Sequence, residues 1–515
     1  MKRYVLCAAL LLSGCSASRQ TREYPATSAV SILHWNDFHA QNIPFRVTKK
    51  TVTGTDTSYH VGGTATLLGY IDSLRRDRKS VAVLNAGDDF QGTPISSITA
   101  GRSQIELMRI ISPDAVTLGN HEFDYGIDSL RRNISRAPYS IVCANVLDDS
   151  ASATLVPAYT VVSVGGAKLG IIGLTAPDLQ LLTIKKNLLG LSLRPVDRAL
   201  DDAIHELQLK HQPDIIILLS HMGFESDTAL AARRDDVDII VGGHSHTALF
   251  SPVKKKGTII VQAGSRGRYL GKLDLVVDLG GDSVISYEEQ LIETRVDGVT
   301  PDPAAAAKVA ELESLVDSTF DEVIGTLTTP WDRSPNQKKE SNIGNWQCDV
   351  MRRATNTDIA FQNSAGIRRN LDAGPIKVRD VWEMNPFGNT LVKFAVKGDV
   401  LRRMVERQAG IKAREFLQVS GLKYVYDSSK PEGQTLLSIE VSGKPLIDST
   451  LYSISTNNYV SGHLYDFLGI EDAAVHLEDT GILDRDVLIQ AVRDTQTISS
   501  GIEGRIVDVR KQLSK

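Results

Sequence analysis

Cysteine is scarce in this chain, and neither sign of charge is in large excess. The 515 residues include only four cysteines, and the formal net charge at pH 7 is −5. A protein whose main partner is a nucleic-acid polymer usually carries a basic excess, so that class does not fit and the substrate is expected to be small. With 42% hydrophobic and 23% charged residues, the composition is that of a globular protein long enough for two large domains.

The N-terminus has the pattern of an export signal. Met1–Arg3 is basic, Tyr4–Leu12 is apolar, and Leu12-Ser13-Gly14-Cys15 is similar to a bacterial lipobox. The apolar run is too short to span a bilayer permanently. We therefore expect residues 1–14 to be a lipoprotein signal peptide and Cys15 to be lipidated. The mature protein would be anchored to the bacterial envelope, at the periplasmic or outer-membrane surface. A cleaved secretory signal with an incidental cysteine is the alternative.

The segment 15–28 is rich in Ser, Thr, Ala and Arg, which is typical of a flexible tether. Removal of Cys7 with the signal and lipidation of Cys15 leave Cys143 and Cys348, one in each expected domain. No structural disulfide is therefore expected, even in an oxidising compartment.

Five polar motifs each come shortly after an apolar run of strand character. Runs this short, bounded by Gly or polar residues, predict buried strands. Buried strands that alternate with helical segments predict a layered α/β sheet, in which ligands lie at the carboxyl ends of the strands. All five motifs should therefore meet at one place. They are Asp37-Phe38-His39, Gly87-Asp88, Gly119-Asn120-His121-Glu122-Phe123-Asp124, Ser220-His221 and Gly243-His244-Ser245-His246.

The side chains in these motifs are of the kinds that bind divalent transition metals, since they include two Asp, one Asn and five His. Any one of these histidines, taken alone, is more often a solvated loop residue. The whole set is hard to explain that way, because six of the eleven histidines, with His34 included, fall at strand ends or within the motifs.

The order D-x-H, G-D, G-N-H-E, S-H, G-H-x-H resembles that of the calcineurin-like metallophosphoesterases. When the C-terminal half is included, the resemblance covers nearly the whole chain and is to the 5′-nucleotidase family. This resemblance implies an α/β fold with an N-terminal four-layer α/β/β/α metallophosphoesterase domain and a second α+β substrate-binding domain. We expect the dimetal phosphoesterase domain at residues 29–295, a linker helix at 296–321 and a nucleotide-binding 5′-nucleotidase C-terminal domain at 322–515.

The resemblance also implies two divalent metal ions, Zn or Mn, with Asp88 as the carboxylate that both share. Two ions that share a ligand can lower the pKa of a bound water to near neutrality. The H-x-H spacing would put both rings on one face of an extended segment, in the loop just beyond Val241. The remaining ligands would be Asp37, His39 and His246 for one ion and Asn120, His221 and His244 for the other.

His121 resembles the family residue that contacts the phosphate and assists the leaving oxygen, with Asp124 orienting its ring. A carboxylate that holds one ring nitrogen fixes the tautomer and favours the charged form. The alternative for Asp124 is that it only caps a helix.

The second half carries loops that resemble the nucleotide-binding domain of the family. Phe387 and Tyr459 are in the positions of two aromatic rings that sandwich the nucleobase, and Asn363 and Arg368 match residues that contact the substrate. Two positions depart from the family pattern. Lys339 stands where the family has Arg and cannot form a bidentate fork, and a Gly-Gly-Asp turn is replaced by a longer turn that ends at Asp466. Both remain candidate substrate ligands.

The expected function is metal-dependent hydrolysis of nucleoside 5′-monophosphates to nucleoside and phosphate, in nucleotide catabolism or salvage outside the cytoplasm. Two alternatives use the same dimetal site: a 2′,3′-cyclic nucleotide phosphodiesterase and a nucleotide-sugar pyrophosphatase. An alternative from another class is a non-catalytic surface lipoprotein that binds nucleotides. That alternative requires a vestigial metal centre, whereas every ligand position is filled.

Overall fold

The computed structural model describes residues 27–50, 56–78, 80–316, 318–333, 339–409, 415–471 and 474–512. The expected signal peptide, Cys15 and most of the expected tether lie outside the described residues. Strand β1 (Thr27–Trp35) includes the last two residues of the expected tether, and Ser28 is already buried. Among the described residues, no helix is both long and apolar enough to cross a membrane.

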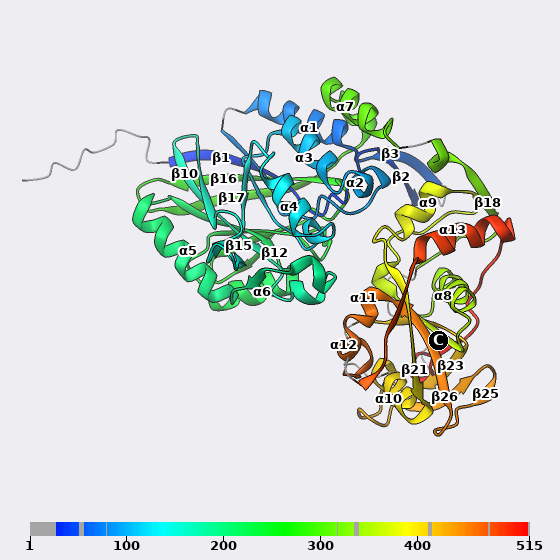
Figure 1. Cartoon of the computed structure of the whole chain (residues 1–515). Helices are drawn as coiled ribbons and strands as arrows, with labels where there is room; N and C mark the ends of the chain where they lie inside the picture. The colour runs from blue at the N-terminus through cyan, green and yellow to red at the C-terminus, as the bar shows by residue number, and fades with distance from the viewer. Residues whose placement is uncertain are drawn as a thin grey trace, which may run out of the picture.

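Two six-stranded sheets form the centre of the first domain (Figure 1). In the first sheet the order is β17-β16-β1-β4-β5-β6, and in the second it is β14-β15-β13-β12-β10-β9. The strands of the first sheet are β1, β4 (Val81–Asn85), β5 (Ala115–Thr117), β6 (Ser140–Val142), β16 (Tyr269–Asp278) and β17 (Ser283–Glu293). Those of the second are β9 (Tyr159–Val164), β10 (Ala167–Thr175), β12 (Ile215–His221), β13 (Ile239–Gly242), β14 (Val253–Lys255) and β15 (Thr258–Val261).

The two sheets pack face to face over one apolar core. Ile32 and Leu84 of the first sheet and Ile171, Ile217 and Ile239 of the second belong to this core, and each has an exposed fraction of 0%. Full burial of such a side chain stabilises the fold by about 1.5–3 kcal/mol. The predicted strand runs are apolar at nearly every position because their other faces are also covered.

Helices cover the outer faces of both sheets. Apolar residues of α1 (Thr64–Asp77) and α3 (Arg102–Ile111) pack on the first sheet, and those of α5 (Val196–Lys210) and α6 (Phe224–Arg233) pack on the second. The order of layers is therefore α/β/β/α, which confirms the expected fold class.

Helix α7 (Pro303–Glu313) connects the two domains and packs against α1 and α3. It begins at a proline, which suits the first helical position, and Asp302 caps it by accepting a hydrogen bond of 2.7 Å from the Ala305 N–H. At its other end, Glu313 accepts a hydrogen bond of 2.9 Å from Arg379 Nη1 in α9 (Val378–Met384) of the second domain.

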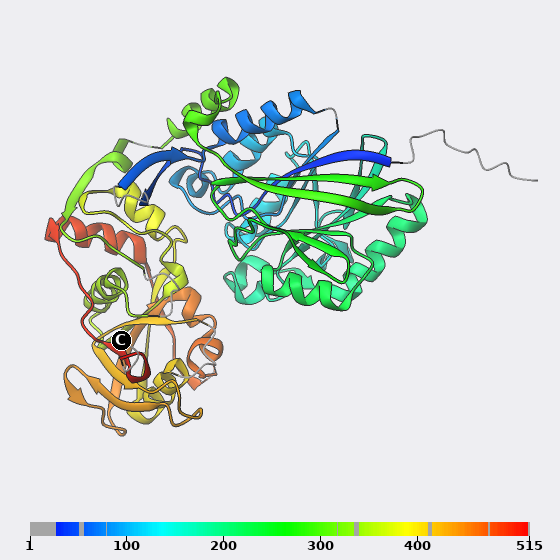
Figure 2. The same cartoon turned by 180° about the vertical axis from the view of Figure 1, so that it is seen from behind.

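The second domain is an α+β unit, as expected. Its main sheet has the order β22-β19-β26-β21-β27 and is accompanied by a four-stranded and a three-stranded sheet. The main strands are β19 (Ile359–Asn363), β21 (Thr390–Lys397), β22 (Leu417–Ser420), β26 (Leu451–Asn457) and β27 (Glu478–Leu483). The larger helices are α8 (Asn342–Thr355), α10 (Gly398–Ala409) and α13 (Asp484–Thr495), and two short helices are α11 (Asn458–Ser461) and α12 (Leu464–Leu468). Figures 1 and 2 show α11 and α12 on the side that faces the first domain.

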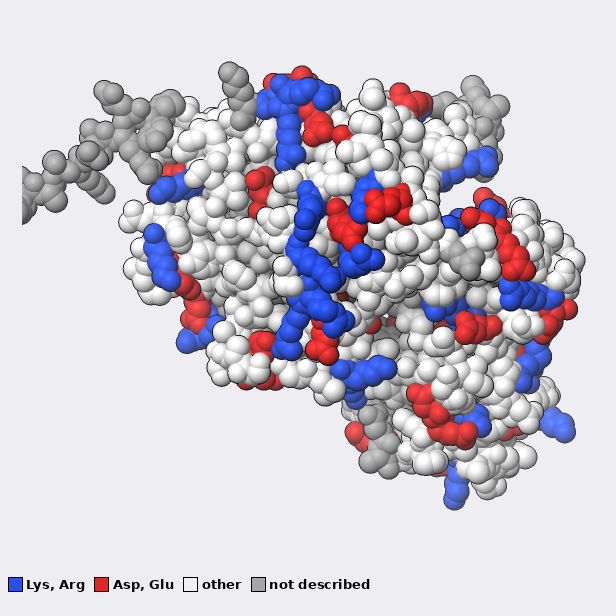
Figure 3. Space-filling model, turned by 45° about the horizontal axis from the view of Figure 1, so that its top comes forward, with Lys and Arg blue, Asp and Glu red and all other residues white. Residues whose placement is uncertain are grey.

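Charges of both signs are mixed over the surface. The face in Figure 3 carries a band of Lys and Arg with Asp and Glu beside it. Ion pairs such as Arg131 with Asp148, at 2.6 Å, accompany this mixing. Cys143 and Cys348 are both free and buried, in different domains.

Candidate active site

Five strands of the first domain that precede the predicted ligands end at one edge of the two sheets. Strands β1, β4 and β5 run parallel to one another, and so do β12 and β13. Because parallel strands have their carboxyl ends at the same edge, the loops that follow them meet. His221 is the last residue of β12, whereas the other predicted ligands lie in loops. Those loop residues are Asp37, His39, Asp88, Asn120, His244 and His246.

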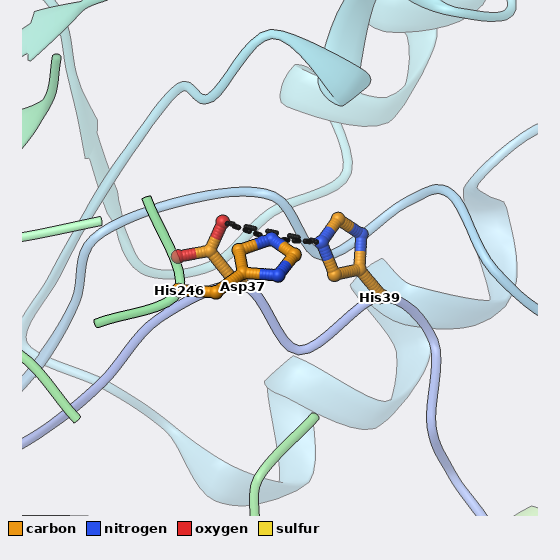
Figure 4. Close-up of side chains that lie close together, drawn as sticks. All are labelled: Asp37, His39 and His246. Carbon is orange, nitrogen blue, oxygen red and sulfur yellow. Dashed lines mark hydrogen bonds and ion pairs between the residues drawn. The ribbon is translucent and has the colours of Figure 1, made fainter. Parts of the chain in front are cut away.

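Three groups of described side chains could each hold a metal ion, and the third group, His39, Asp88 and His121, shares a residue with each of the other two. Asp37, His39 and His246 form the first, and Figure 4 shows the three side chains converging. In this set His246 Nε2 lies 3.2 Å from Asp37 Oδ1 and 3.0 Å from His39 Nε2. Three predicted ligands that are far apart in the sequence therefore lie close together in the structure.

Asp88, His221 and His244 form the second set. His221 Nε2 lies 3.1 Å from Asp88 Oδ2, and Asn120 Oδ1 lies 2.9 Å from His244 Nδ1. His39 and Asp88 also fall within one group of possible ligands. Asp88 thus lies next to both sets, as a shared carboxylate requires.

The tautomers of the histidines fit metal binding. His221 Nδ1 donates to the Ala86 carbonyl at 2.6 Å, so its Nε2 carries the lone pair when the ring is neutral. That buried Nε2 has no hydrogen-bond partner among the described residues. It faces the Asp88 carboxylate, so a proton on this nitrogen or a bound metal cation is needed between them. A carbonyl acceptor on the other ring nitrogen is the usual support of a metal-bound histidine.

The pKa values of two of these histidines also suit metal binding. Burial and the neighbouring His221 lower the pKa of His244 to about 4, and burial and His246 hold the pKa of His39 well below its usual value. Both rings are therefore neutral and free to bind a metal near pH 7. Burial lowers the pKa of His221, but Asp88 and Asp37 outweigh it and raise the pKa to about 10. The carboxylates thus favour a positive charge at this point.

Five of the predicted ligands have a left-handed backbone, and one expectation is wrong in consequence. The φ angle is 50° at Asp37, 51° at His39, 62° at Asp88, 71° at His244 and 55° at His246. The H-x-H segment does lie in the loop beyond Val241, but it is not extended. Strain of this kind costs about 1–3 kcal/mol per residue and persists where surrounding contacts enforce it. Here the amide of His244 donates to Asp37 Oδ2 at 2.9 Å.

His121 and Asp124 form a hydrogen-bonded pair next to the metal ligands. Nδ1 of His121 lies 2.7 Å from Asp124 Oδ2, and its Nε2 lies 3.9 Å from Asp88 Oδ2. Burial lowers the pKa of His121, but Asp124 and Asp88 outweigh it, so the pKa is raised. The following helix, α4 (Ile127–Ile134), has Gly126 as its N-cap, so Asp124 is not the cap of that helix. His121 also falls in a group of possible ligands with His39 and Asp88.

A cavity of about 530 Å³ lies between the two domains and contains this pair. Its size is typical of a site for a small organic ligand. The metal-site residues Asp88, Asn120, His244 and His246 and the dyad His121 and Asp124 line one side. Four of the predicted substrate ligands line it from the second domain: Asn363, Arg368, Phe387 and Tyr459.

Phe387 and Arg368 lie close to the His121–Asp124 pair. The ring of Phe387 is 5.8 Å from that of His121, and the Arg368 guanidinium carbon is 5.7 Å from the Phe387 ring. Burial lowers the pKa of Arg368, while Asp88, Asp124 and Asp37 act in the opposite direction. The positive charge of Arg368 therefore lies near the carboxylates of the first domain.

Two predicted substrate ligands are not brought to this cavity. Lys339 is exposed, and its backbone carbonyl accepts a hydrogen bond of 2.8 Å from Gln418 Nε2. Asp466 lies in α12, where its carbonyl accepts from Arg407 at 3.4 Å. Neither side chain lines the cavity. Asp466 lies within helix α12 and not at the end of an open turn, and Lys339 lies on the exposed surface.

Sequence reasoning missed one wall of the cavity, the loop that follows β10. Its side chains Asp178, Leu182, Thr183, Ile184 and Asn187 line the cavity. The only signal in the sequence is a short apolar stretch without helical or strand period. Asn187 Nδ2 donates to the Asp124 carbonyl at 2.8 Å, which connects this loop to the His121–Asp124 pair.

A second cavity, of about 570 Å³, shares His246 and Arg368 with the first and reaches His39. Its lining includes Arg46, Arg266, Arg333, Arg368 and Arg369 and the acidic residues Asp372, Asp380 and Glu383. Burial together with Arg368 and Arg333 lowers the pKa of Arg266 to about 10. Positive charge is therefore in excess here.

Comparison with known proteins agrees with this geometry. Residues 30–248 match the calcineurin-like phosphoesterase family, and residues 323–468 match the C-terminal domain of 5′-nucleotidases. An apyrase of Tabanus yao is 30% identical over 536 residues, which are 94% of this chain and 94% of the apyrase. The human 5′-nucleotidase is 28% identical over 94% of this chain and 92% of its own length.

The crystal structure of a 5′-nucleotidase precursor from Thermus thermophilus superposes with a TM-score of 0.85 at 30% identity, covering 93% of this chain and 99% of that one. The segment that matches the phosphoesterase family contains the cluster of His and Asp side chains, and the segment that matches the C-terminal domain contains Phe387 and Tyr459. This chain is therefore a phosphoester hydrolase that belongs to the 5′-nucleotidase family.

Proposed function

We propose that this enzyme hydrolyses nucleoside 5′-monophosphates to nucleoside and phosphate. One observation carries the proposal: a single cavity has the metal-binding cluster and His121 on one side and two aromatic rings, Phe387 and Tyr459, on the other. A molecule that fills it needs a phosphate at one end and a flat apolar group at the other. A nucleotide has both, and stacking on aromatic rings tolerates any base.

The described side chains divide the work of hydrolysis. Asp37, His39, Asp88, Asn120, His221, His244 and His246 would hold two divalent ions, Zn or Mn, which supply Lewis acidity and lower the pKa of a water. Arg368 would bind the phosphate, since a guanidinium matches its oxygens. His121 would donate a proton from Nε2 to the leaving 5′ oxygen, while Asp124 holds its Nδ1–H. Asn363 would position the substrate from the second domain.

We also propose that the enzyme is located outside the cytoplasm. The N-terminal pattern that ends at Cys15 supports export and a lipid anchor in the bacterial envelope, where the enzyme would act in nucleotide salvage.

The second cavity supports a second candidate substrate class. A phosphoryl group with substituents on both sides, as in a nucleotide sugar, needs room beyond the metal site. The arginine-rich cavity shares His246 and Arg368 with the first and provides such room with positive charge. We therefore include diphosphates among the candidate substrates.

A substrate panel tests these proposals, with phosphate release measured for the two phosphate monoesters and formation of a nucleoside monophosphate measured for the nucleotide sugar and the cyclic nucleotide. The metal-loaded protein is assayed with AMP, a small phosphate ester without a base, a nucleotide sugar and a 2′,3′-cyclic nucleotide. We expect the highest kcat/KM for AMP. Equal kcat/KM for AMP and the small ester would contradict a nucleotide-specific site, and a preference for the nucleotide sugar would favour the second candidate.

A further inference from the structure

His463 connects the two domains at the edge of the substrate cavity. It immediately precedes α12 and is only 3% exposed. Its Nδ1 lies 2.8 Å from the carbonyl oxygen of Tyr459 in its own domain. Its Nε2 lies 3.0 Å from the carbonyl oxygen of Gln180 in the first domain. Both ring nitrogens therefore face backbone carbonyls.

The two contacts together specify the protonation of the ring. A carbonyl oxygen can only accept a hydrogen bond, and a neutral imidazole has only one N–H to donate. A neutral ring would therefore point a lone pair at one of the two oxygens. Only the doubly protonated, positively charged ring can donate to both Tyr459 and Gln180.

The carbonyl of Gln180 belongs to the loop that walls the cavity. The next carbonyl in that loop, of Leu181, accepts a hydrogen bond of 2.8 Å from the Tyr459 hydroxyl. Leu182, Thr183 and Ile184 follow directly and line the cavity. The loop is thus held at consecutive residues by two side chains of the second domain. The rings of these two side chains, Tyr459 and His463, lie 5.0 Å apart.

We propose that His463 is a positioning residue that holds the Tyr459 wall of the cavity against the 178–187 loop and so sets the affinity for nucleotides. Without the hydrogen bonds of this ring the contact between the two domains is weakened, and nucleotides should bind less tightly. The choice of a nucleotide as the probe rests on the proposed function, whereas the contact itself does not.

The kinetic test compares His463→Phe, which keeps a ring but donates no hydrogen bond, with His463→Gln, which stays neutral. His476→Gln, at an exposed histidine of the same domain, is the matched control. We expect the KM for AMP to rise about tenfold in His463→Phe, because the variant loses the hydrogen bond to Gln180 that joins the two domains, and one such bond is worth up to about that factor. The kcat should be nearly unchanged, and so should hydrolysis of a small phosphate ester.

Two kinetic results would overturn the proposal. One is a KM for AMP that is no higher in His463→Phe than in the unmodified enzyme. The other is an equal loss of kcat/KM on AMP and on the small ester. Circular dichroism checks that each variant is folded, and if the Phe variant is not, the Gln variant carries the comparison.

Hydrogen exchange gives a readout that needs no substrate. In the metal-loaded full chain, amides of residues 178–187 should exchange faster in His463→Phe than in the unmodified protein at the same pH, and His476→Gln should leave them unchanged. If AMP is not hydrolysed but exchange increases, the proposed function fails and the role of His463 stands. Unchanged exchange in this loop would refute that role whatever the substrate.

Discussion

The aromatic ring of Phe387 lies 5.8 Å from the imidazole of His121, centroid to centroid, although the two residues belong to different domains. The proposed base-binding wall is therefore adjacent to the proposed proton donor. A nucleotide bound in this cavity would contact both within the length of its ribose.

Replacing Phe387 by Ala should raise the KM for AMP by about five- to 150-fold, because stacking of a base on one ring is worth about 1–3 kcal/mol. Hydrolysis of a small phosphate ester should change far less. Phe387→Leu is the control, since it keeps apolar bulk beside His121 but cannot stack. We expect it to resemble the Ala variant on AMP and the unmodified enzyme on the small ester. Equal loss on both substrates would mean that Phe387 supports the domain or His121 instead.

The convergence of the candidate metal ligands could be predicted from the sequence, whereas the loop and the turn at the cavity could not. Asp37, His39 and His221 lie at the ends of short apolar strands, and parallel strands end at one edge. The loop around Leu182 becomes a wall only through contacts with Tyr459 and His463, more than 270 residues away. Such contacts leave no local pattern. The helical turn that carries Asp466 away from the cavity and the left-handed backbone of His244 depend on tertiary contacts in the same way.

His121→Ala should lower kcat by about 10²–10⁴-fold, the usual contribution of a positioned acid or base, and should leave the metal content unchanged. The comparison is His221→Ala, which removes a side chain with a lone pair directed at Asp88 and should lose metal. Metal analysis of both purified variants checks this. Equal metal loss in the two would make His121 a ligand.

Asp124→Asn tests the partner of His121. The raised pKa of His121 depends on the charge of Asp124, so the pKa should fall in this variant. Less of the ring then carries the proton it donates, and the alkaline limb of the kcat profile should move to lower pH. An unchanged pH profile of kcat would show that Asp124 does not tune His121.

Asp484→Asn should stabilise the protein at pH 8. Burial raises the pKa of Asp484 to about 7, above the usual value of about 4 in an unfolded chain. The folded state therefore binds this proton more tightly, and stability falls as pH rises from about 4 through 7. Removing the charge should raise Tm at pH 8 relative to the unmodified protein and bring little or no gain at pH 4. A gain in Tm independent of pH would contradict a buried titrating carboxylate.

Stoichiometry of bound metal in Asp88→Asn tests the central claim most directly. Asp88 lies next to both sets of ligands, with its Oδ2 3.1 Å from His221 Nε2. We predict two divalent ions per chain in the unmodified protein. The Asp88→Asn variant should lose affinity for both ions together, and hydrolysis of every substrate should fall with it. The control is Asp484→Asn, which changes a carboxylate of the other domain and should keep both ions. An Asp88→Asn protein that still binds two ions tightly would contradict a shared carboxylate at the centre of this site.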